Sequence, residues 1–448
     1  MTLSTVDTKV SDFLHNSVIE ALPTWVEALI GGDLQQVEQQ LSETCCTIFN
    51  EVMDHILPHA AKEIMSETMA AKPTNCRVRS CTIRLLTGHS VSMDNLYDRQ
   101  PIEPEHTSRH HLLRHWKSVN GTSLGLCDRV GYLAMLSPSF DLASQAFEKV
   151  TTAKVSTSSV DKITNRLAVK CHEQGEENLA LESSETLEGK RLQIGFDGGR
   201  SRIRDYTGEL NERGNSTFNT PWVEPKLFVI HVLKEDGQLD KDFNPIYGCR
   251  FGDDESVDLM GCYLAKLQVA GVKEVQIVGD GASWIWNRVK SKLLQLGVAE
   301  EKITETIDYG HAASYLHQLV DAMPKRIGKK KRKQYLKEMK DALKAGDTDA
   351  IYLMCQSVFK RQSQLVRRWI NYFVKHNERM QYADFESAKL SKGSGIVESA
   401  IRRVINLRFK NSSTFWLAEN LEKLYFLRCA MLSGRWNTVI KNLANSAK

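Results

Sequence analysis

Hydrophobic and polar residues follow two different periods in the first hundred positions. Apolar side chains recur near the helical period of about 3.6 residues at Leu14, Val18, Leu22, Val26 and Ile30. The pair Gly31-Gly32 interrupts this pattern, so residues 12–70 are predicted to be helical with one break. Residues 72–96 alternate between apolar and polar side chains, which predicts extended structure with a turn at Gly88.

Two short helices with a tight break between them are predicted next. They cover about Phe140–Val150 and Thr157–Val169, and Ser156 is a suitable N-cap because its hydroxyl can accept a backbone N–H of the first turn. This pattern fits a DNA-binding helix-turn-helix, and it fits a plain helical hairpin equally well because the second helix is only mildly basic. The acidic, polar residues 171–189 predict a linker.

From Arg191 onward, apolar runs with strand character alternate with helical spacing. One strand is predicted from Arg191 to the turn at Asp197, and another ends at Asp280. Further strands are predicted over residues 226–233, 243–251 and 303–307. Helices are predicted over residues 255–270 and 284–296. This order predicts a mixed sheet flanked by helices. Beyond His311, almost every segment to about residue 429 has helical spacing.

The composition is that of an ordinary globular protein. The chain has 448 residues, of which 42% are hydrophobic and 25% charged, and this excludes disordered, collagen-like and disulfide-scaffold chains. No apolar run approaches the roughly 18 residues that a membrane span needs, and the N-terminal segment lacks the pattern of a secretory signal. No two of the 10 cysteines form a C-x-x-C pair. We therefore expect a cytosolic protein with reduced, mostly structural thiols and no membrane partner.

The formal net charge of +4 conceals a strong asymmetry. Residues 325–448 carry 27 Lys+Arg against 10 Asp+Glu, a net of +17, and the remainder of the chain carries −13. Such a division indicates a polyanionic partner for the basic part. A dense run of basic residues is often just the solvated face of a helix. Here we expect the densest run to contact a phosphate backbone, through Lys329, Lys330, Lys331, Arg332 and Lys333.

Three carboxylates have a context that suggests chemistry. Asp197 and Asp280 each end a predicted strand and are followed directly by glycine, where α/β sheets place functional groups. Glu398 follows a Gly-Ser-Gly entry into a helix, and basic residues come after it: Arg402, Arg403, Arg408 and Lys410. The plainer alternatives are a turn or cap role for each aspartate and an exposed Glu398–Arg402 helix pair. Together the three carboxylates could hold two hard cations beside a phosphate backbone.

Five segments between about Arg191 and Trp436 have a distinctive order: G-F-D-G-G, V-G-D-G-A-S-W-I-W, I-D-Y-G-H-A-A-S-Y-L, N-E-R-M-Q-Y-A-D-F and G-S-G-I-V-E-S-A-I-R-R-V-I-N-L-R-F-K. In order and context they resemble a bacterial insertion-sequence transposase of the DDE class. The resemblance implies an α/β ribonuclease-H-like core and a helical insertion before the last acid. It also implies two Mg²⁺ ions, for which Mn²⁺ can substitute. Asp197, Asp280 and Glu398 would then be the catalytic, metal-binding acids.

The resemblance also implies a function, a cytoplasmic location in a bacterium in association with the nucleoid, and a domain plan. The function is metal-dependent cleavage at transposon ends and transfer of the 3′-OH into target DNA, by a homo-oligomer bound to double-stranded DNA. A domesticated, catalytically silent DNA-binding protein and a nuclease without strand transfer are the alternatives. The expected parts are a mainly helical N-terminal region (1–135), the helix-turn-helix-like segment with its linker (136–190), the core (191–314 and 386–448) and the insertion (315–385).

His311 and Trp284 are the remaining candidate site residues. Taken alone, His311 reads as a helix-start or core histidine, whereas the I-D-Y-G-H motif favours a catalytic supporting role beside the acids. Trp284 and Trp286 could stack on an unpaired base, but residues two apart on a helix face different sides, so at least one belongs to the core. We assign the DNA contact to Trp284.

Histidines at positions 106, 110, 111 and 115 could form a metal site. His106, His110 and His111 could share one helix face, as zinc ligands do. No cysteine or carboxylate lies at a matching spacing in the sequence, so we do not expect zinc there.

Overall fold

The computed structural model describes residues 10–70, 75–100, 102, 108–151, 153–411 and 414–446. The chain forms two compact units, Met1–Leu179 with Asn437–Lys448 (unit 1) and Ala180–Trp436 (unit 2). Residues 437–448 therefore belong to unit 1, whereas the sequence predicted them in the core. Within the described ranges, no helix is long and apolar enough to cross a membrane.

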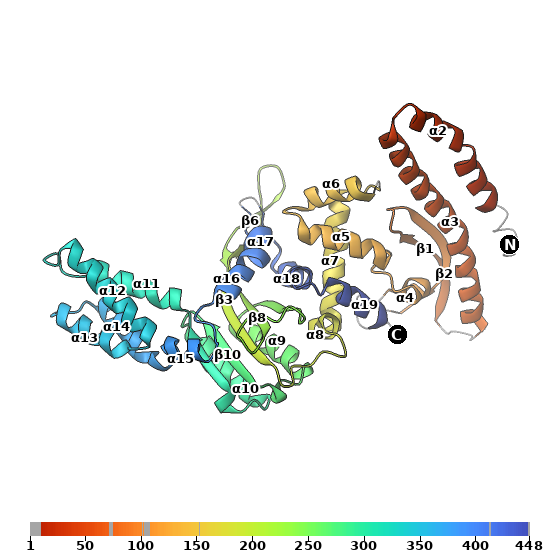
Figure 1. The fold of residues 1–448 in the computed structure, drawn as a ribbon. Coiled ribbons are helices and arrows are strands. Elements are labelled where there is room, and N and C mark those ends of the chain that lie inside the picture. Colours follow the sequence, from red (N-terminus) through yellow and green to blue (C-terminus); the bar gives the residue numbers. More distant parts are fainter. Residues whose placement is uncertain are drawn as a thin grey trace. The chain divides into compact units, whose positions relative to one another are not determined.

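Unit 1 combines a long helix, a β-hairpin and several shorter helices (Figure 1). Its elements are η1 (His15–Ile19), α2 (Leu22–Ile30), α3 (Leu34–Ala70), β1 (Cys76–Arg84), β2 (Ser90–Asp98), α4 (His111–His115), α5 (Leu124–Leu136), α6 (Phe140–Thr151), α7 (Thr157–Gln174), α8 (Glu176–Ala180) and α19 (Trp436–Ser446), with the last two shared with unit 2 by one residue each.

The hairpin β1–β2 packs one face on α3. Alternate residues of β2 are buried, and the core beneath it is formed by Ala61, Cys81, Ile83, Val91 and Met93 with their neighbours. The predicted break at Gly31-Gly32 and the turn at Gly88, where φ is 84°, are confirmed. Residues 71–74, which include the predicted start of the extended segment at Lys72, lie outside the described residues.

The two predicted short helices are α6 and α7. The Ser156 side chain caps α7 by accepting the backbone N–H of Ser159 at 3.3 Å, as predicted. The predicted linker over residues 171–189 is partly wrong, because α7 continues to Gln174 and α8 follows it. Cys171 and Leu179 are buried, so these turns pack instead of spanning solvent.

Unit 2 is an α/β unit. Its strands are β3 (Arg191–Gly198), β4 (Ser201–Arg202), β5 (Asp205–Leu210), β6 (Ser216–Asn219), β7 (Trp222–Val223), β8 (Pro225–Leu233), β9 (Ile246–Phe251), β10 (Glu274–Gly279) and β11 (Ile303–Ile307). The helices between strands β9 and β11 are α9 (Asp253–Lys266), η2 (Val269–Gly271), η3 (Ile285–Val289), α10 (Lys290–Gln295) and η4 (Glu300–Lys302).

Helices make up the rest of unit 2, as predicted. They are α11 (Tyr309–Asp321), α12 (Lys329–Ala345), α13 (Thr348–Val358), α14 (Gln364–Lys375), η5 (Asn377–Met380), α15 (Tyr382–Ser387), α16 (Gly395–Ile401), η6 (Arg402–Asn406), α17 (Leu407–Phe409) and α18 (Ala418–Leu432). Helices α12–α14 lie together away from the sheet (Figure 1).

The central sheet has five strands in the order β11-β10-β3-β8-β9. Strands β11, β10 and β3 run parallel, and β8 and β9 join by antiparallel pairing. Strands β3 and β8 are buried along most of their length, as expected for a sheet that is covered on both faces. This mixed sheet flanked by helices confirms the architecture predicted from the alternating pattern, and it is compatible with a ribonuclease-H-like fold.

Helices α16 and α9 cover opposite faces of the sheet. A Cβ added to Gly195 on β3 would lie 3.1 Å from the Val397 Cβ, so α16 packs directly on this glycine. The next residue, Phe196, pairs with Phe228, whose ring lies 6.2 Å from Tyr263 on α9. Because successive strand residues point to opposite faces, Asp197 points to the same face as Gly195, on which α16 lies.

Candidate active site

The three predicted acids lie on elements that meet at one edge of the sheet. Asp197 is the penultimate residue of β3, and Asp280 follows β10 directly. Since β3 and β10 are neighbouring parallel strands, their C-terminal ends lie at the same edge. Glu398 lies on α16, which packs on β3 through Val397. A small residue at position 195 is what permits this close approach.

The electrostatics of Asp197 link the three carboxylates. Burial raises the pKa of the Asp197 carboxyl to about 6, and the Asp280 and Glu398 carboxylates also act to raise it. The backbone N–H of Gly198 and the His311 side chain act in the opposite direction and lower this pKa. All four side chains therefore share one electrostatic neighbourhood, in which a cation would relieve the repulsion among the acids.

Each carboxylate is oriented by one hydrogen bond. The Gly198 N–H donates to Asp197 Oδ1 at 2.7 Å, and the Ala282 N–H donates to Asp280 Oδ1 at 2.9 Å. The Ser394 hydroxyl lies 3.1 Å from Glu398 Oε1. Within the described part of the chain, no hydrogen bond is made to the second oxygen of these carboxylates.

This donor set fits hard divalent cations. Carboxylate oxygens are the ligands that Mg²⁺ and Mn²⁺ prefer. In the described residues, the ligand atoms of the three acids do not all lie within 4.8 Å of one another.

Asp308 fixes the turn that carries Glu398. It follows β11 and is only 6% exposed. Its Oδ1 accepts the His311 N–H at 2.6 Å and caps α11, and its Oδ2 accepts the Ser394 N–H at 2.5 Å. The Ser394 hydroxyl has a single proton, which it can donate either to this Oδ2 at 3.0 Å or to Glu398 Oε1 at 3.1 Å. Asp308 is therefore a positioning residue for Glu398.

Tyr372, on α14, is a site residue that sequence reasoning missed. Its hydroxyl donates to the backbone carbonyl of Asp280 at 3.1 Å, and its ring lies 4.3 Å from that of Tyr315. Gly281 adopts a φ of 99°, and a Cβ there would lie 2.8 Å from the Tyr372 hydroxyl oxygen. A contact across 92 positions leaves no local signal in the sequence, so only the fold reveals it.

The two tryptophans differ in burial. Trp286 is buried, 5% exposed, and belongs to the core, which confirms that at least one of the pair is structural. Trp284 is half-buried, and its ring lies edge-on, 5.3 Å from that of Phe196, the residue before Asp197. Phe196 points to the face of the sheet opposite to that of Asp197, so Trp284 packs away from the first acid, and its predicted DNA contact stays a prediction.

The predicted basic run begins α12. Lys329, Lys330, Lys331 and Lys333 are exposed there, in the first turns of the helix. The Arg332 guanidinium instead donates to backbone carbonyls at the end of α11, including Met323 O at 2.6 Å and Asp321 O at 3.1 Å. The predicted DNA contact of Arg332 is therefore not supported, because its donors stabilise a helix end.

The basic residues after Glu398 also separate into two kinds. Arg402 and Lys410 are exposed, as a DNA contact requires. Arg408 is 1% exposed and lies 4.9 Å from the centre of the Trp416 ring, and burial lowers its pKa to about 10. Its predicted DNA contact is wrong because the side chain is inside the core. Arg403 is half-buried and donates to the Tyr247 hydroxyl at 2.9 Å, so its predicted contact is weakened as well.

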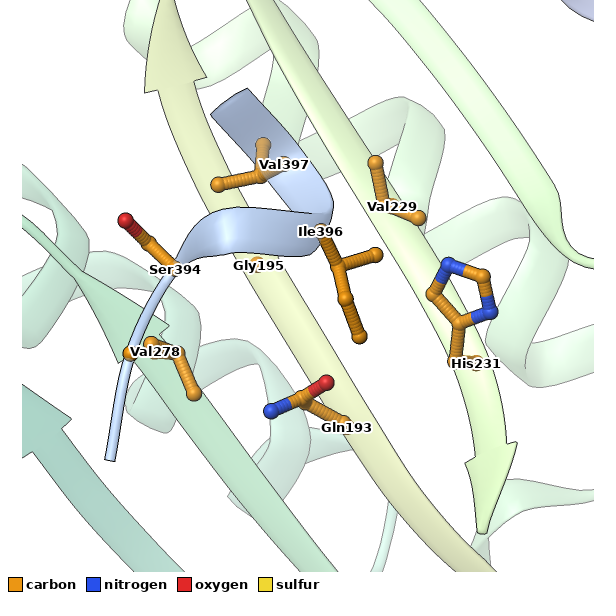
Figure 2. Close-up of a pocket in the computed structure, with 9 residues that line it drawn as sticks. Gln193, Gly195, Val229, His231, Val278, Ser394, Ile396 and Val397 are labelled. Atoms are coloured by element: carbon orange, nitrogen blue, oxygen red, sulfur yellow. The ribbon is translucent and has the colours of Figure 1, made fainter. Parts of the chain in front are cut away.

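A small hollow lies under the turn into α16. Figure 2 shows Ser394, Ile396 and Val397 above strands β3 and β8, with His231 at the far side. Burial lowers the pKa of His231 to about 4, and no described residue forms a hydrogen bond with its Nε2. The hollow has room for roughly one water molecule, so it is not a substrate site.

The raised pKa of Asp197 predicts how stability depends on pH. Without divalent metal, the folded state holds a proton on Asp197 up to about pH 6, whereas the unfolded carboxyl loses it near its ordinary value of 3.8. The free energy of unfolding should therefore fall between about pH 4 and pH 6 and then level off. Asp197→Asn should remove this part of the slope, as measured by chemical denaturation in EDTA from pH 4 to pH 7.

The matched control for this experiment is Asp254→Asn, because that carboxylate is 70% exposed on α9. Its curve should run parallel to that of the wild type. If the stability curve of Asp197→Asn also ran parallel to that of the wild type over the whole pH range, a raised pKa of Asp197 in the folded state would be excluded.

Comparisons with known proteins are sparse. No family model and no curated protein matches the chain. Among solved structures, the chain is similar to a Drosophila P element transposase strand transfer complex, with 12% sequence identity over 72% of this chain and 81% of that chain. The TM-score of 0.25 is too low for the likeness to carry an argument about fold or function.

Proposed function

We propose that the chain is a DDE-class transposase with a ribonuclease-H-like core, of the kind found in bacterial insertion sequences. The strand order β11-β10-β3-β8-β9, with β8 and β9 antiparallel to β3, supports this fold. The acids at the ends of β3 and β10 and on α16 are Asp197, Asp280 and Glu398, and they support the activity. The observation that carries the proposal is that Asp197 and Asp280 lie at the ends of neighbouring parallel strands, while Glu398 lies on the helix that packs on β3.

Asp197, Asp280 and Glu398 would hold two Mg²⁺ or Mn²⁺ ions. Such ions polarise a phosphodiester and neutralise the charge that develops during its cleavage. The residues of the chain prepare the site: backbone N–H groups orient the two aspartates, and Asp308 with Ser394 holds the turn of Glu398. His311 lies close enough to Asp197 to affect its pKa, and in this proposal it contacts the scissile phosphate.

The proposed reaction has two phosphoryl-transfer steps. In the first, a water oxygen bonds to phosphorus at the element end, the bond from phosphorus to the 3′ oxygen breaks, and the water proton passes to solvent. In the second, the freed 3′ oxygen bonds to a phosphorus of target DNA and displaces its 3′ oxygen. Each step exchanges one P–O bond for another, so the reaction requires neither an energy source nor a covalent protein–DNA intermediate.

The lysines of α12 support a DNA partner. Cations at a helix N-terminus oppose the helix dipole and cost stability, which acidic residues at the same positions would instead increase. Lys329, Lys330, Lys331 and Lys333 occupy these unfavourable positions and form no ion pair within the described residues. A phosphate backbone lying along them explains the pattern. Two DNA ends and a target require pairing of chains, so a homo-oligomer on DNA is part of the proposal.

The test is whether the chain both cuts and joins DNA. The substrate is a duplex that carries the inverted repeat flanking the reading frame, incubated with Mg²⁺ and a supercoiled target plasmid, with EDTA as control. We expect cut ends and plasmid-joined products, both dependent on Mg²⁺. Cut ends without joined products would replace the proposal with a nuclease. Binding without either product would replace it with a silent DNA-binding protein.

A further inference from the structure

A cysteine, an aspartate and a histidine of unit 1 lie together at one end of the β-hairpin. Cys76 Sγ is 3.2 Å from Asp98 Oδ1 and 3.7 Å from His111 Nε2. His111 Nε2 is 3.0 Å from the same Asp98 Oδ1. Among the described residues, this is the one group of His, Cys, Asp or Glu whose ligand atoms all lie within 4.8 Å of one another.

The backbone brings the three residues together. Cys76 and Asp98 are directly opposite each other in the antiparallel register of β1 and β2. His111 begins α4, which lies beside the hairpin in Figure 1. The start of α4 is fixed by the Leu112 N–H, which donates to Asn95 Oδ1 on β2 at 2.9 Å. The cluster is therefore held by hydrogen bonds that do not involve its own side chains.

The triangle of donor atoms matches the size of a zinc site. With Zn–S near 2.3 Å and Zn–N and Zn–O near 2.0–2.2 Å, a tetrahedral ion separates its ligands by roughly 3.4–3.6 Å. The three observed separations of 3.0, 3.2 and 3.7 Å lie within a few tenths of an ångström of these values. An ion roughly 2 Å from all three atoms fits without any movement of the backbone.

The charges of the cluster also suit zinc. A thiolate, a carboxylate and a neutral imidazole together carry two negative charges, which one Zn²⁺ ion neutralises. The second oxygen of Asp98 lies 2.8 Å from Arg114 Nη1, the type of outer contact that orients a metal-binding carboxylate.

We propose that Cys76, Asp98 and His111 bind a zinc ion, whose fourth ligand is water. The ion joins the open ends of β1 and β2 to the first residue of α4. This proposal differs from the expectation of no zinc among these histidines. The missing partners were Cys76 and Asp98, which are 35 and 13 positions from His111.

His110 and His115, the other histidines of the motif within the described residues, take no part in the cluster. The distance from His110 Nδ1 to Asn95 Nδ2 is 2.8 Å. His115 is exposed at the end of α4, and His106 lies outside the described residues. The cluster is therefore different from a set of histidines that share one helix face.

The test begins with the unmodified full-length chain. The chain is purified without chelators and then dialysed. We expect inductively coupled plasma mass spectrometry to find about one zinc ion per chain. X-ray absorption at the zinc edge should show one sulfur neighbour together with nitrogen and oxygen neighbours. Absence of retained zinc, or a shell without sulfur, would overturn the proposal without the use of any variant.

Variants then assign the ligands. Cobalt bound in place of zinc should give a thiolate charge-transfer band that Cys76→Ser abolishes, and His111→Gln should weaken cobalt binding at least about 10-fold. Cys45→Ser on α3 and His115→Gln on α4 change exposed residues of the same types and should leave band and affinity unchanged. Asp280→Asn should also retain the band, which separates this site from the three acids of unit 2. A band that persists in Cys76→Ser would exclude the assignment.

Discussion

Asp280→Asn is expected to lower cleavage of the element end by at least about 10³-fold while the fold persists. An amide keeps the shape of the side chain but carries no negative charge, so it binds a divalent cation poorly. A loss of that size corresponds to about 4 kcal/mol of transition-state stabilisation, the several kcal/mol that ion-assisted phosphoryl transfer supplies.

The environment of Asp280 makes this substitution structurally mild. The Ala282 N–H donates to Asp280 Oδ1, and an asparagine carbonyl can accept the same hydrogen bond. The Tyr372 hydroxyl donates to the backbone carbonyl of residue 280, which the substitution leaves in place. A loss of activity would therefore report lost charge and not a displaced strand.

The measurement is a single-turnover cleavage rate on a duplex carrying the element end, at saturating protein and Mg²⁺. Asp254→Asn is the matched control, because the same change is made on an exposed carboxylate whose ion pair with Arg288 is at the surface. The control should cleave within about 2-fold of the wild type. If Asp280→Asn cleaves at the wild-type rate, the assignment of the second acid is wrong.

Replacing Lys329, Lys330, Lys331 and Lys333 together with alanine is expected to weaken duplex binding on the order of 10- to 100-fold near 0.1 M salt. Each lost phosphate contact also lowers the slope of log affinity against log salt by about 0.9, so the total change should approach 3 to 4. Folding should be unaffected or improved, since the substitutions remove cations from a helix N-terminus.

Binding isotherms at several salt concentrations measure both effects. The matched control replaces four exposed lysines of the same unit that lie outside α12: Lys234, Lys241, Lys266 and Lys273. Both variants lose the same total charge, so a simple effect of net charge would alter them equally. Equal losses in the two variants, or an unchanged salt slope in the α12 variant, would contradict a phosphate-tracking role for this helix.

Much of unit 2 could be predicted from the sequence. Strand β11 (Ile303–Ile307) has the predicted bounds, and β3, β8, β9 and β10 lie where apolar β-branched runs end in glycine or polar turns. The hairpin β5–β6 was missed because all residues of β5 are exposed, so it lacks an apolar alternation. Charge alone could not separate Arg332 and Arg408 from the exposed lysines, because burial is decided by distant neighbours.

The sequence by itself determined most strands and helices of unit 2 and the choice of Asp197, Asp280 and Glu398 as candidate acids, because period, turn residues and motif order are local properties. The tertiary structure decided which side chains meet. The approach of Val397 to Gly195, the bond from Ser394 to Asp308 and the meeting of Cys76 with His111 all join segments far apart in the chain. Such contacts depend on strand register and helix packing, which no local pattern encodes.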